Sequence, residues 1–122
     1  MSASNDAEPL VLHPIGQVSE DQRVIEIFAQ FEAGLEGVEE IEHLWVLYWM
    51  HALPEEQRRV LRAHPRGDRS RPVRGVFALH SPVRPNPIGL TRVRLLGREG
   101  NRLVVEGLDA LPGSPVLDLK SG

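Results

Sequence analysis

The stretch HSPVRPNPIGL, residues 80–90, contains three prolines together with an arginine, an asparagine and a glycine. Each proline fixes its own φ, lacks an N–H and biases the preceding residue toward extended backbone. A chain held in this way loses little conformational entropy when it meets a ligand. It can hold Arg84 and Asn86 at fixed positions, while Gly89 permits close backbone approach or a sharp turn. Spacing alone leaves two interpretations open, a ligand-binding loop and a rigid corner of a sheet.

Histidine and aspartate occur at two further places where they can do chemistry. His43 and His51 flank an apolar run, and their even spacing would put them on one face of a strand. With His80 they suggest a metal site, but histidines at strand ends are more often packing residues, so we expect no metal. Asp109 precedes the turn-forming ALPG, where an aspartate commonly bonds nearby backbone. Asp109 and His51 are the candidate general bases.

Charge is divided unevenly along the chain. Residues 1–56 sum to −11, with Arg23 as their only basic group, whereas residues 57–122 sum to +8. Arginine forks match phosphates and stack on bases, so the seven arginines within residues 58–74 are a candidate contact for a polyanion. The alternatives are a solvated loop, and pairing of the acidic and basic halves within the fold or across a dimer. Three of these arginines are our candidate RNA-binding residues: Arg62, Arg66 and Arg69.

Size and composition limit the class of protein. A chain of 122 residues with 41% apolar and 25% charged residues predicts one folded domain spanning 1–122, in which we expect residues 1–9 to be flexible. The absence of cysteine excludes a disulfide framework, a thiolate zinc site and a thiol nucleophile. The start of the sequence does not look like a secretory leader, and no apolar stretch approaches membrane-spanning length. We therefore expect a cytoplasmic protein without membrane association.

Short strands separated by turns dominate the pattern. Residues 43–51 hold seven apolar or aromatic residues between two histidines and predict a central strand covered on both faces. Residues 32–42 predict a loop or short helical turn, 54–64 open like a helix, and GREGN at 97–101 predicts a hairpin turn. The other expected strands are 10–18 (interrupted at Pro14), 23–28, 73–79, 88–96, 102–108 and 115–120. This pattern predicts a mainly all-β fold, a small closed antiparallel β-barrel with short helical insertions.

The segment RGVFALHSPVRPNPIGLT, residues 74–91, closely resembles the signature of the TsaA-like family. Characterised members are S-adenosylmethionine-dependent methyltransferases that act on N6-threonylcarbamoyladenosine beside the anticodon of tRNA. HPIGQV (13–18), GLEGVEEIEHLWVLYWMH (34–51) and GLDALPGSPVLDLK (107–120) also resemble family segments, in the family's order. The resemblance implies a small dimeric β-barrel that binds S-adenosylmethionine near these loops and needs no metal. The absence of a glycine-rich Rossmann fingerprint agrees with this.

The resemblance also implies which residues contact the cofactor. Eight positions match the family's pattern: Met50, His51, His80, Leu90, Gly107, Leu108, Asp109 and Ala110. The proline loop adds three further candidates: Ser81, Arg84 and Asn86. A sulfonium methyl donor needs in-line placement of a nucleophile and surroundings that tolerate a cation becoming neutral, such as a carboxylate or an aromatic face. We expect Trp45, Tyr48 and Trp49 in the core or a dimer interface, where an exposed one can stack on a base.

Three departures suggest a shortened member of the family. Only SEDQR, residues 19–23, stands where relatives usually carry a longer loop with a proline-arginine-glutamine element that helps to hold the cofactor. His80 stands where relatives commonly have arginine, so this contact is shorter and titratable. The sequence ends at LDLKSG, where relatives typically continue.

We therefore expect an S-adenosylmethionine-dependent methyltransferase that modifies N6 of threonylcarbamoyladenosine in tRNA. The alternatives are a relative that binds a ligand or a partner without methyl transfer, and a methyltransferase acting on a small molecule. Retention of RPNPIG and GLDA favours a pocket still in use, whereas the short loop favours altered chemistry.

Overall fold

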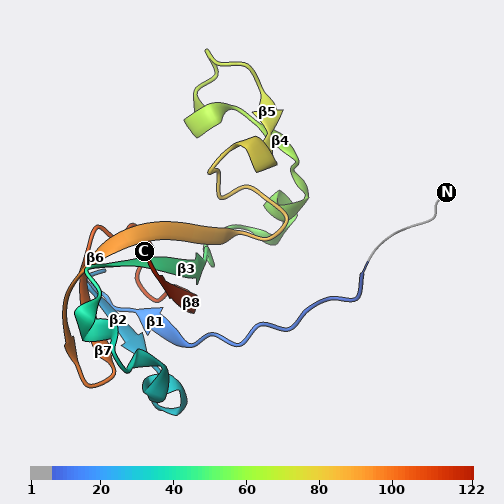
Figure 1. Ribbon diagram of the computed structural model, residues 1–122. Coiled ribbons are helices and arrows are strands. Elements are labelled where there is room, and N and C mark those ends of the chain that lie inside the picture. Colours follow the sequence, from blue (N-terminus) through green and yellow to red (C-terminus); the bar gives the residue numbers. More distant parts are fainter. Residues whose placement is uncertain (1–6) are drawn as a thin grey trace.

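A closed ring of antiparallel strands forms the main body of the computed structural model, which describes residues 7–122 (Figure 1). The order around the ring is β1-β2-β7-β6-β3-β8, and β8 pairs again with β1. The ring strands are β1 (Gly16–Val18), β2 (Val24–Ile27), β3 (His43–Trp49), β6 (Ile88–Glu99), β7 (Arg102–Glu106) and β8 (Pro115–Ser121). The expected mainly β architecture with few helical segments is confirmed.

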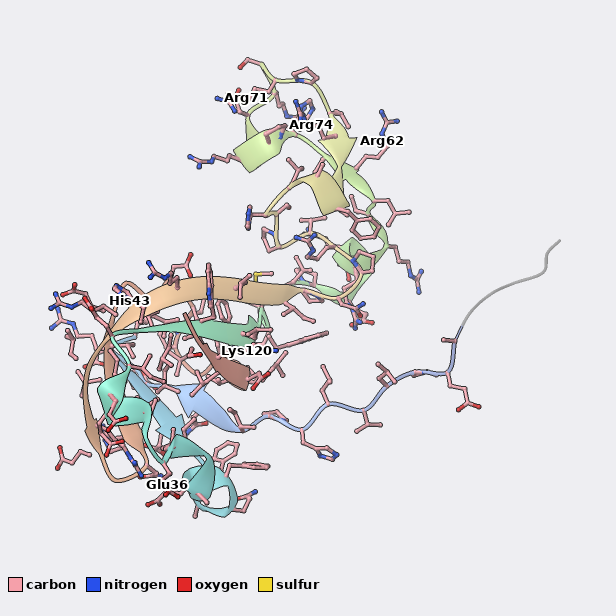
Figure 2. All side chains as sticks on the ribbon, viewed as in Figure 1. Glu36, His43, Arg62, Arg71, Arg74 and Lys120 are labelled. Carbon is pink, nitrogen blue, oxygen red and sulfur yellow. The ribbon has the colours of Figure 1, made fainter. Side chains whose placement is uncertain are left out.

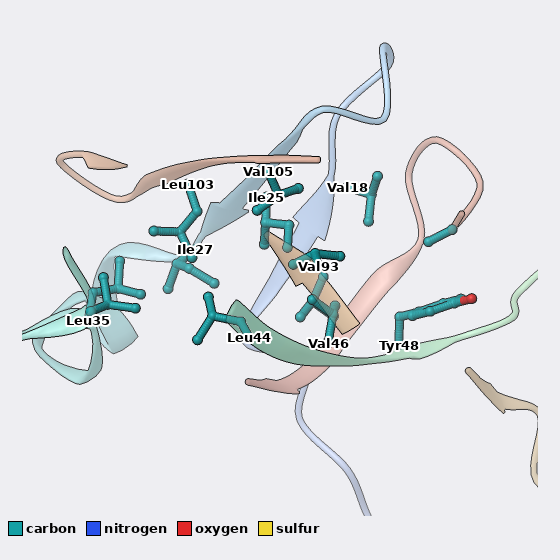
Figure 3. Close-up of a cluster of buried hydrophobic side chains, with 13 residues drawn as sticks. Val18, Ile25, Ile27, Leu35, Leu44, Val46, Tyr48, Val93, Leu103 and Val105 are labelled. Carbon is teal, nitrogen blue, oxygen red and sulfur yellow. The ribbon is translucent and has the colours of Figure 1, made fainter. Parts of the chain in front are cut away.

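Alternate residues of the ring strands point inward and form the core (Figure 3). In β3, Leu44, Val46 and Tyr48 are buried, while Trp45 between them keeps 37% of its surface exposed. The expectation that residues 43–51 are covered on both faces is therefore wrong, because a strand in a closed ring has one inner and one outer face. Fully buried aliphatic side chains, worth roughly 1.5–3 kcal/mol each, come from the other strands as well: Ile25, Ile27, Val93, Leu103 and Val116.

Two short 3-10 helices, η1 (Ala29–Leu35) and η2 (Val38–Glu40), follow β2 and pack Leu35 and Val38 against the core. They confirm the helical turns expected within residues 32–42. The expected hairpin turn after residue 97 joins β6 to β7, and Gly100 takes a φ of 62° there. Within residues 7–122, no helix is long and apolar enough to cross a membrane.

Residues 52–87 leave the ring between β3 and β6 and form a projecting segment, called the arm below (Figure 1). Its elements are η3 (Glu55–Arg59), β4 (Arg62–Ala63), η4 (Pro65–Gly67), β5 (Arg74–Gly75) and η5 (Val76–Ala78), with β4 paired to β5. Figure 2 labels Arg62, Arg71 and Arg74 on the arm and Glu36 at the opposite end of the molecule. Basic residues of the second half of the sequence thus lie on the arm, far from the acidic residue Glu36 of the first half.

The guanidinium of Arg84 holds the second half of the arm together. It donates to the carbonyl oxygens of Val76, Leu79 and Ser81, each at 3.1 Å. These carbonyls belong to a bent segment that lacks a strand partner. A planar fork with several donors suits this task better than a single amide would, because it satisfies three acceptors at once.

The root of the arm is tied to the ring by two sets of contacts. Arg58 Nε donates to the carbonyl of Pro85 at 2.7 Å, and the Arg58 guanidinium lies over the Trp49 ring, 5.3 Å from its centroid. The amide of Met50 donates to the carbonyl of Pro87 at 2.8 Å. The proline loop is therefore fixed against the end of β3 by bonds to its carbonyls, which proline retains.

Two expectations within the arm are wrong. The helix expected at 54–64 stops after Glu55–Arg59, because the adjacent apolar residues Val60 and Leu61 do not repeat at helical spacing, and the Leu61 carbonyl accepts the Val76 amide. The strand expected at 73–79 covers only Arg74–Gly75. Arg84 takes the carbonyls of Val76 and Leu79 that a strand ladder would have used.

The first expected strand, 10–18, is also shorter than the sequence suggested. The strand covers only Gly16–Val18, and Leu10 and Val11 before Pro14 are 88% and 78% exposed. Residues 7–9 are likewise exposed and outside any strand. The flexibility expected for residues 1–9 falls partly on 1–6, which lie outside the described residues.

Candidate functional site

A cavity of about 330 Å³ opens where β3 leaves the ring. Its walls come from the end of β3 and the start of the arm, from the proline loop, and from the loop between β7 and β8. The wall is mostly apolar, as is typical of small-molecule sites. Residues that line it include Tyr48, Met50, Leu53, Pro82, Asp109 and Ala110.

The carboxylate of Asp109 is the acidic group of this wall, and two hydroxyl groups hold it. Tyr48 Oη donates to Asp109 Oδ1 at 2.9 Å, and Thr91 Oγ1 donates to the same oxygen at 2.6 Å. Among residues 7–122, no arginine or lysine forms an ion pair with Asp109. The site therefore combines an apolar wall with a carboxylate that has no cationic partner.

Tyr48 reaches Asp109 because β6 leaves room for its ring. Gly89 pairs with Tyr48 across β3 and β6, and a Cβ at residue 89 would overlap the phenol ring. Thr91 stands two residues farther along the same strand, so it shares the face of Gly89. The glycine at the end of the proline loop is thus needed for close approach, one of the two roles expected for it.

Burial is the main cause that raises the pKa of the Tyr48 hydroxyl above its ordinary value, and the neighbouring Asp109 carboxylate raises it further. The neutral phenol is therefore the form that the folded protein favours. The stability linked to this group is complete below the ordinary pKa of tyrosine and is lost as pH rises through the raised folded-state value. At neutral pH, Tyr48 is a hydrogen-bond donor.

The loop between β7 and β8 is braced from two directions. Ser114 Oγ donates to the Leu111 carbonyl at 2.6 Å, and Gln22 Nε2 donates to the Ala110 carbonyl at 2.7 Å. Gln22 has a φ of 62°, a conformation that non-glycine residues rarely adopt and that is found preferentially at functional sites. The turn between β1 and β2 thus supports the segment that carries Asp109.

The model of the tRNA-methyltransferase O N-terminal domain family matches residues 13–121, which include the ring, the arm and the cavity. The chain belongs to this family. A crystal structure of TrmO from Pseudomonas aeruginosa superposes with a TM-score of 0.73 at 29% identity, covering 98% of this chain and 57% of that one. The chain therefore spans a little over half the length of the solved TrmO chain.

Curated relatives cover the same region. A probable S-adenosyl-L-methionine-binding protein of Methanocaldococcus jannaschii is 41% identical over 112 residues, 89% of each chain. An S-adenosyl-L-methionine-binding protein of Archaeoglobus fulgidus is 46% identical over 105 residues, 86% of this chain and 72% of its own length. The membership expected from the sequence is confirmed.

The candidate cofactor contacts of this TrmO-type domain fall into several places. Met50, Asp109 and Ala110 line the cavity. Gly107 and Leu108 line a separate hollow of about 450 Å³ that also includes Gln22. His80 and Ser81 line a hollow of about 510 Å³ on the arm, which shares Pro82 with the cavity.

Four other candidate cofactor contacts do not line the cavity. The guanidinium of Arg84 is occupied by the three arm carbonyls described above. Asn86 is exposed in the proline loop, and Leu90 is 50% exposed and pairs with Leu47 across β3 and β6. His51 lies exposed in the turn after β3. The common strand face proposed for His43 and His51 does not form, since β3 ends at Trp49.

Sequence reasoning missed Tyr48, Thr91 and Gln22 as parts of the site. Tyr48 was expected in the core or an interface, and the residue is indeed only 7% exposed, but its hydroxyl reaches the cavity wall. A phenol at an inward position near a strand end was the available signal, because buried tyrosine usually needs a partner for its hydroxyl. Thr91 and Gln22 carry no comparable signal, because their partners lie 18 and 88 residues away.

We predict that Gly89→Ala destabilises the domain by roughly 1–3 kcal/mol, because the new methyl group displaces the Tyr48 ring. Thermal unfolding should show the midpoint falling by several degrees. Gly97→Ala is the matched control, since Gly97 lies in the same strand and a Cβ there would have nothing within 4 Å. Equal midpoints for the two variants would contradict the close approach.

Proposed function

We propose that this protein is an S-adenosylmethionine-dependent methyltransferase whose cofactor occupies the cavity at the end of β3. The observation that carries the proposal is the combination of an apolar cavity of about 330 Å³ with a fixed carboxylate lacking a cationic partner. The volume lies at the lower end of the range for small-molecule sites. The names of the curated relatives agree with this cofactor.

The residues present fit the proposed cofactor. The apolar side chains of Met50 and Leu53 suit an adenine or thioether surface, and the Asp109 carboxylate suits a positive charge. S-adenosylmethionine supplies an activated methyl group to a nucleophile placed in line with the carbon–sulfur bond. Of the two candidate general bases, Asp109 lies in the cavity wall and His51 outside it, so Asp109 is the group able to contact reacting atoms.

The arm supports tRNA as the methyl acceptor. Arg66 and Arg71 line the arm hollow together with His80, and Arg62 and Arg69 are exposed nearby in the sequence. Arginine forks suit phosphodiesters, and the arm hollow meets the cofactor cavity at Pro82. A nucleic-acid backbone on the arm would therefore lie beside the methyl donor. We propose N6 of threonylcarbamoyladenosine as the acceptor, following the family resemblance, and a cytoplasmic location for the protein.

A second copy of the chain is the proposed protein partner. The outer face of β3 and β6 exposes 37% of Trp45, 38% of Ile88 and 50% of Leu90. Exposed apolar groups that adjoin one another commonly mark an interface. The five glutamates of residues 32–42 and the arginines of the arm offer complementary charges to a neighbouring copy, which favours a homodimer over another partner.

We predict micromolar binding of S-adenosylmethionine in calorimetric titration, and a loss of at least about tenfold in affinity for Ala52→Trp. Ala52 is exposed and lines the cavity, so an indole there fills the entrance at little cost to folding. Ala33→Trp, at an exposed position in η1, is the matched control and should bind like the natural sequence. Absence of binding by the natural sequence would refute the proposed cofactor.

Methyl transfer separates the enzyme from a binding protein that has no catalytic activity. Labelled S-adenosylmethionine should transfer its methyl group to tRNA that contains threonylcarbamoyladenosine, and not to tRNA that lacks this modification. Cofactor binding without transfer to any tRNA would favour the non-catalytic alternative, which agrees equally well with relatives named as S-adenosylmethionine-binding proteins.

We predict that tRNA binding weakens with added salt and that Arg66→Gln/Arg69→Gln reduces the slope of log affinity against log salt by about two, roughly one for each phosphate that is no longer neutralised. Fluorescence anisotropy with labelled tRNA measures this. The matched control is Arg94→Gln/Arg102→Gln, which removes the same charge from the ring strands β6 and β7. Equal slopes for the two variants would rule out the arm as the RNA-binding surface.

We predict that the protein sediments as a dimer and that Leu90→Glu converts it to a monomer, because the new charge is buried against the neighbouring copy. Val104→Glu on the outer face of β7 is the control, since Val104 is also partly exposed, at 36%. Sedimentation equilibrium of the natural sequence at monomer mass would contradict the dimer.

A further inference from the structure

Asp109 is held by side chains from two ring strands and not by its own loop. Its Oδ1 accepts hydrogen bonds from Tyr48 in β3 and Thr91 in β6, which lie 61 and 18 residues away in sequence. A turn-forming aspartate would instead bond backbone amides one or two residues ahead. Among residues 7–122, no such bond to Asp109 is present. A bond from Asp109 to the backbone of ALPG, the alternative noted from the sequence, therefore does not account for the observed contacts.

Two donors on one oxygen fix the orientation of the whole carboxylate. Each carboxylate oxygen has about two acceptor sites, so Oδ1 is fully used and Oδ2 is left for another donor. Within the described part of the chain, Oδ2 accepts no hydrogen bond. Because Asp109 lines the cavity, the free oxygen belongs to a group that a ligand can reach.

The charge of Asp109 also lacks compensation. The four ion pairs among residues 7–122 join Arg58, Arg71, Arg98 and Arg102 to other acids, and none includes Asp109. Asp109 is also exposed, so an incoming cation can reach its carboxylate directly. The chemistry that would match this group is a cationic ligand with a hydrogen-bond donor or positive centre near the cavity wall.

We infer that Tyr48 and Thr91 are positioning residues that fix the Asp109 carboxylate in advance, so that Oδ2 faces the cationic ligand of the cavity. This inference rests on the proposed function, which makes that ligand S-adenosylmethionine. Fixing the carboxylate before binding removes the ordering cost that a mobile side chain on an exposed loop would add. Both residues thus increase affinity by holding Asp109, and Thr91, which lies outside the lining of the cavity, acts through Asp109 alone.

A double-mutant cycle separates positioning from general structural support. Tyr48→Phe and Thr91→Val each remove one hydroxyl while keeping the shape of the side chain, and each should weaken S-adenosylmethionine binding roughly threefold to tenfold. In an Asp109→Ala background, the same two substitutions should cause no further loss. Loss of the same size in that background, or unchanged affinity in the single variants, would overturn the inference.

Thr91→Ser is the rescue variant, since serine retains the hydroxyl at the same position. It should bind S-adenosylmethionine like the natural sequence, whereas a loss equal to that of Thr91→Val would show that side-chain shape matters and not the hydrogen bond. S-adenosylhomocysteine lacks the sulfonium charge. Asp109→Ala should therefore lower the affinity for S-adenosylhomocysteine less than it lowers the affinity for S-adenosylmethionine. An equal or larger loss of affinity for S-adenosylhomocysteine would contradict recognition of a positive centre by Asp109.

A second measurement needs no ligand. It tests the positioning of Asp109 separately from the proposed binding of S-adenosylmethionine. Tyr48 is the single tyrosine of the chain, so the absorbance of tyrosinate during alkaline titration reports this residue alone. Asp109→Ala should lower the pKa of Tyr48 relative to the natural sequence, because the acceptor and its negative charge are removed. An unchanged pKa would mean that the contact does not form in solution. Absence of S-adenosylmethionine binding together with the lowered pKa would refute the proposed function and leave the contact established.

Discussion

The pairing of β3 with β6 on one side and β8 on the other is the constraint on which the rest of the structure depends. Because β3 is paired along both edges, its side chains must alternate strictly between the inside and the outside of the ring. Tyr48 is the last inward residue before the strand ends at Trp49. Its ring therefore closes the core while its hydroxyl emerges at the end of the ring, where the cavity begins.

The same constraint explains the composition of the proline loop. The chain must return from the arm into β6 directly opposite Tyr48, where Gly89 is needed to admit the phenol ring. Pro87 is fully buried just before this point, and its carbonyl accepts the Met50 amide. Stiff backbone before Gly89 keeps the two strands in register, so the loop is both a structural corner and part of the cavity wall. The two interpretations that the sequence left open are compatible.

The sequence predicted the structure correctly where local patterns and family motifs coincide. It failed where contacts between residues far apart in the chain determine the structure. The existence of the ring strands and of the hairpin after residue 97 follows from apolar patterns and turn chemistry that lie within a few residues, although the pattern of β3 misled about its outer face. The strand expected at 73–79 fails because Arg84 captures its carbonyls, and no local pattern records this. Asp109 was a candidate from its motif, but the two hydroxyls that hold it come from other strands. Residue types can indicate which groups do chemistry, whereas the supporting contacts depend on the closed fold.

The turn SEDQR, residues 19–23, supports the loop that carries Asp109. It places Gln22 against the segment that carries Asp109, with a hydrogen bond to the Ala110 carbonyl. The left-handed φ of 62° at Gln22 costs of order 1–3 kcal/mol unless the surroundings compensate. Here Ser19 accepts the Gln22 amide, and the Asp21 carboxylate accepts the Arg23 amide, so the turn is held on both sides of the strained residue. A turn followed by one left-handed residue is common in hairpins, and here that residue is Gln22, whose side chain reaches the Asp109 loop. The turn between β1 and β2 therefore braces the part of the cavity wall that carries Asp109 and Ala110.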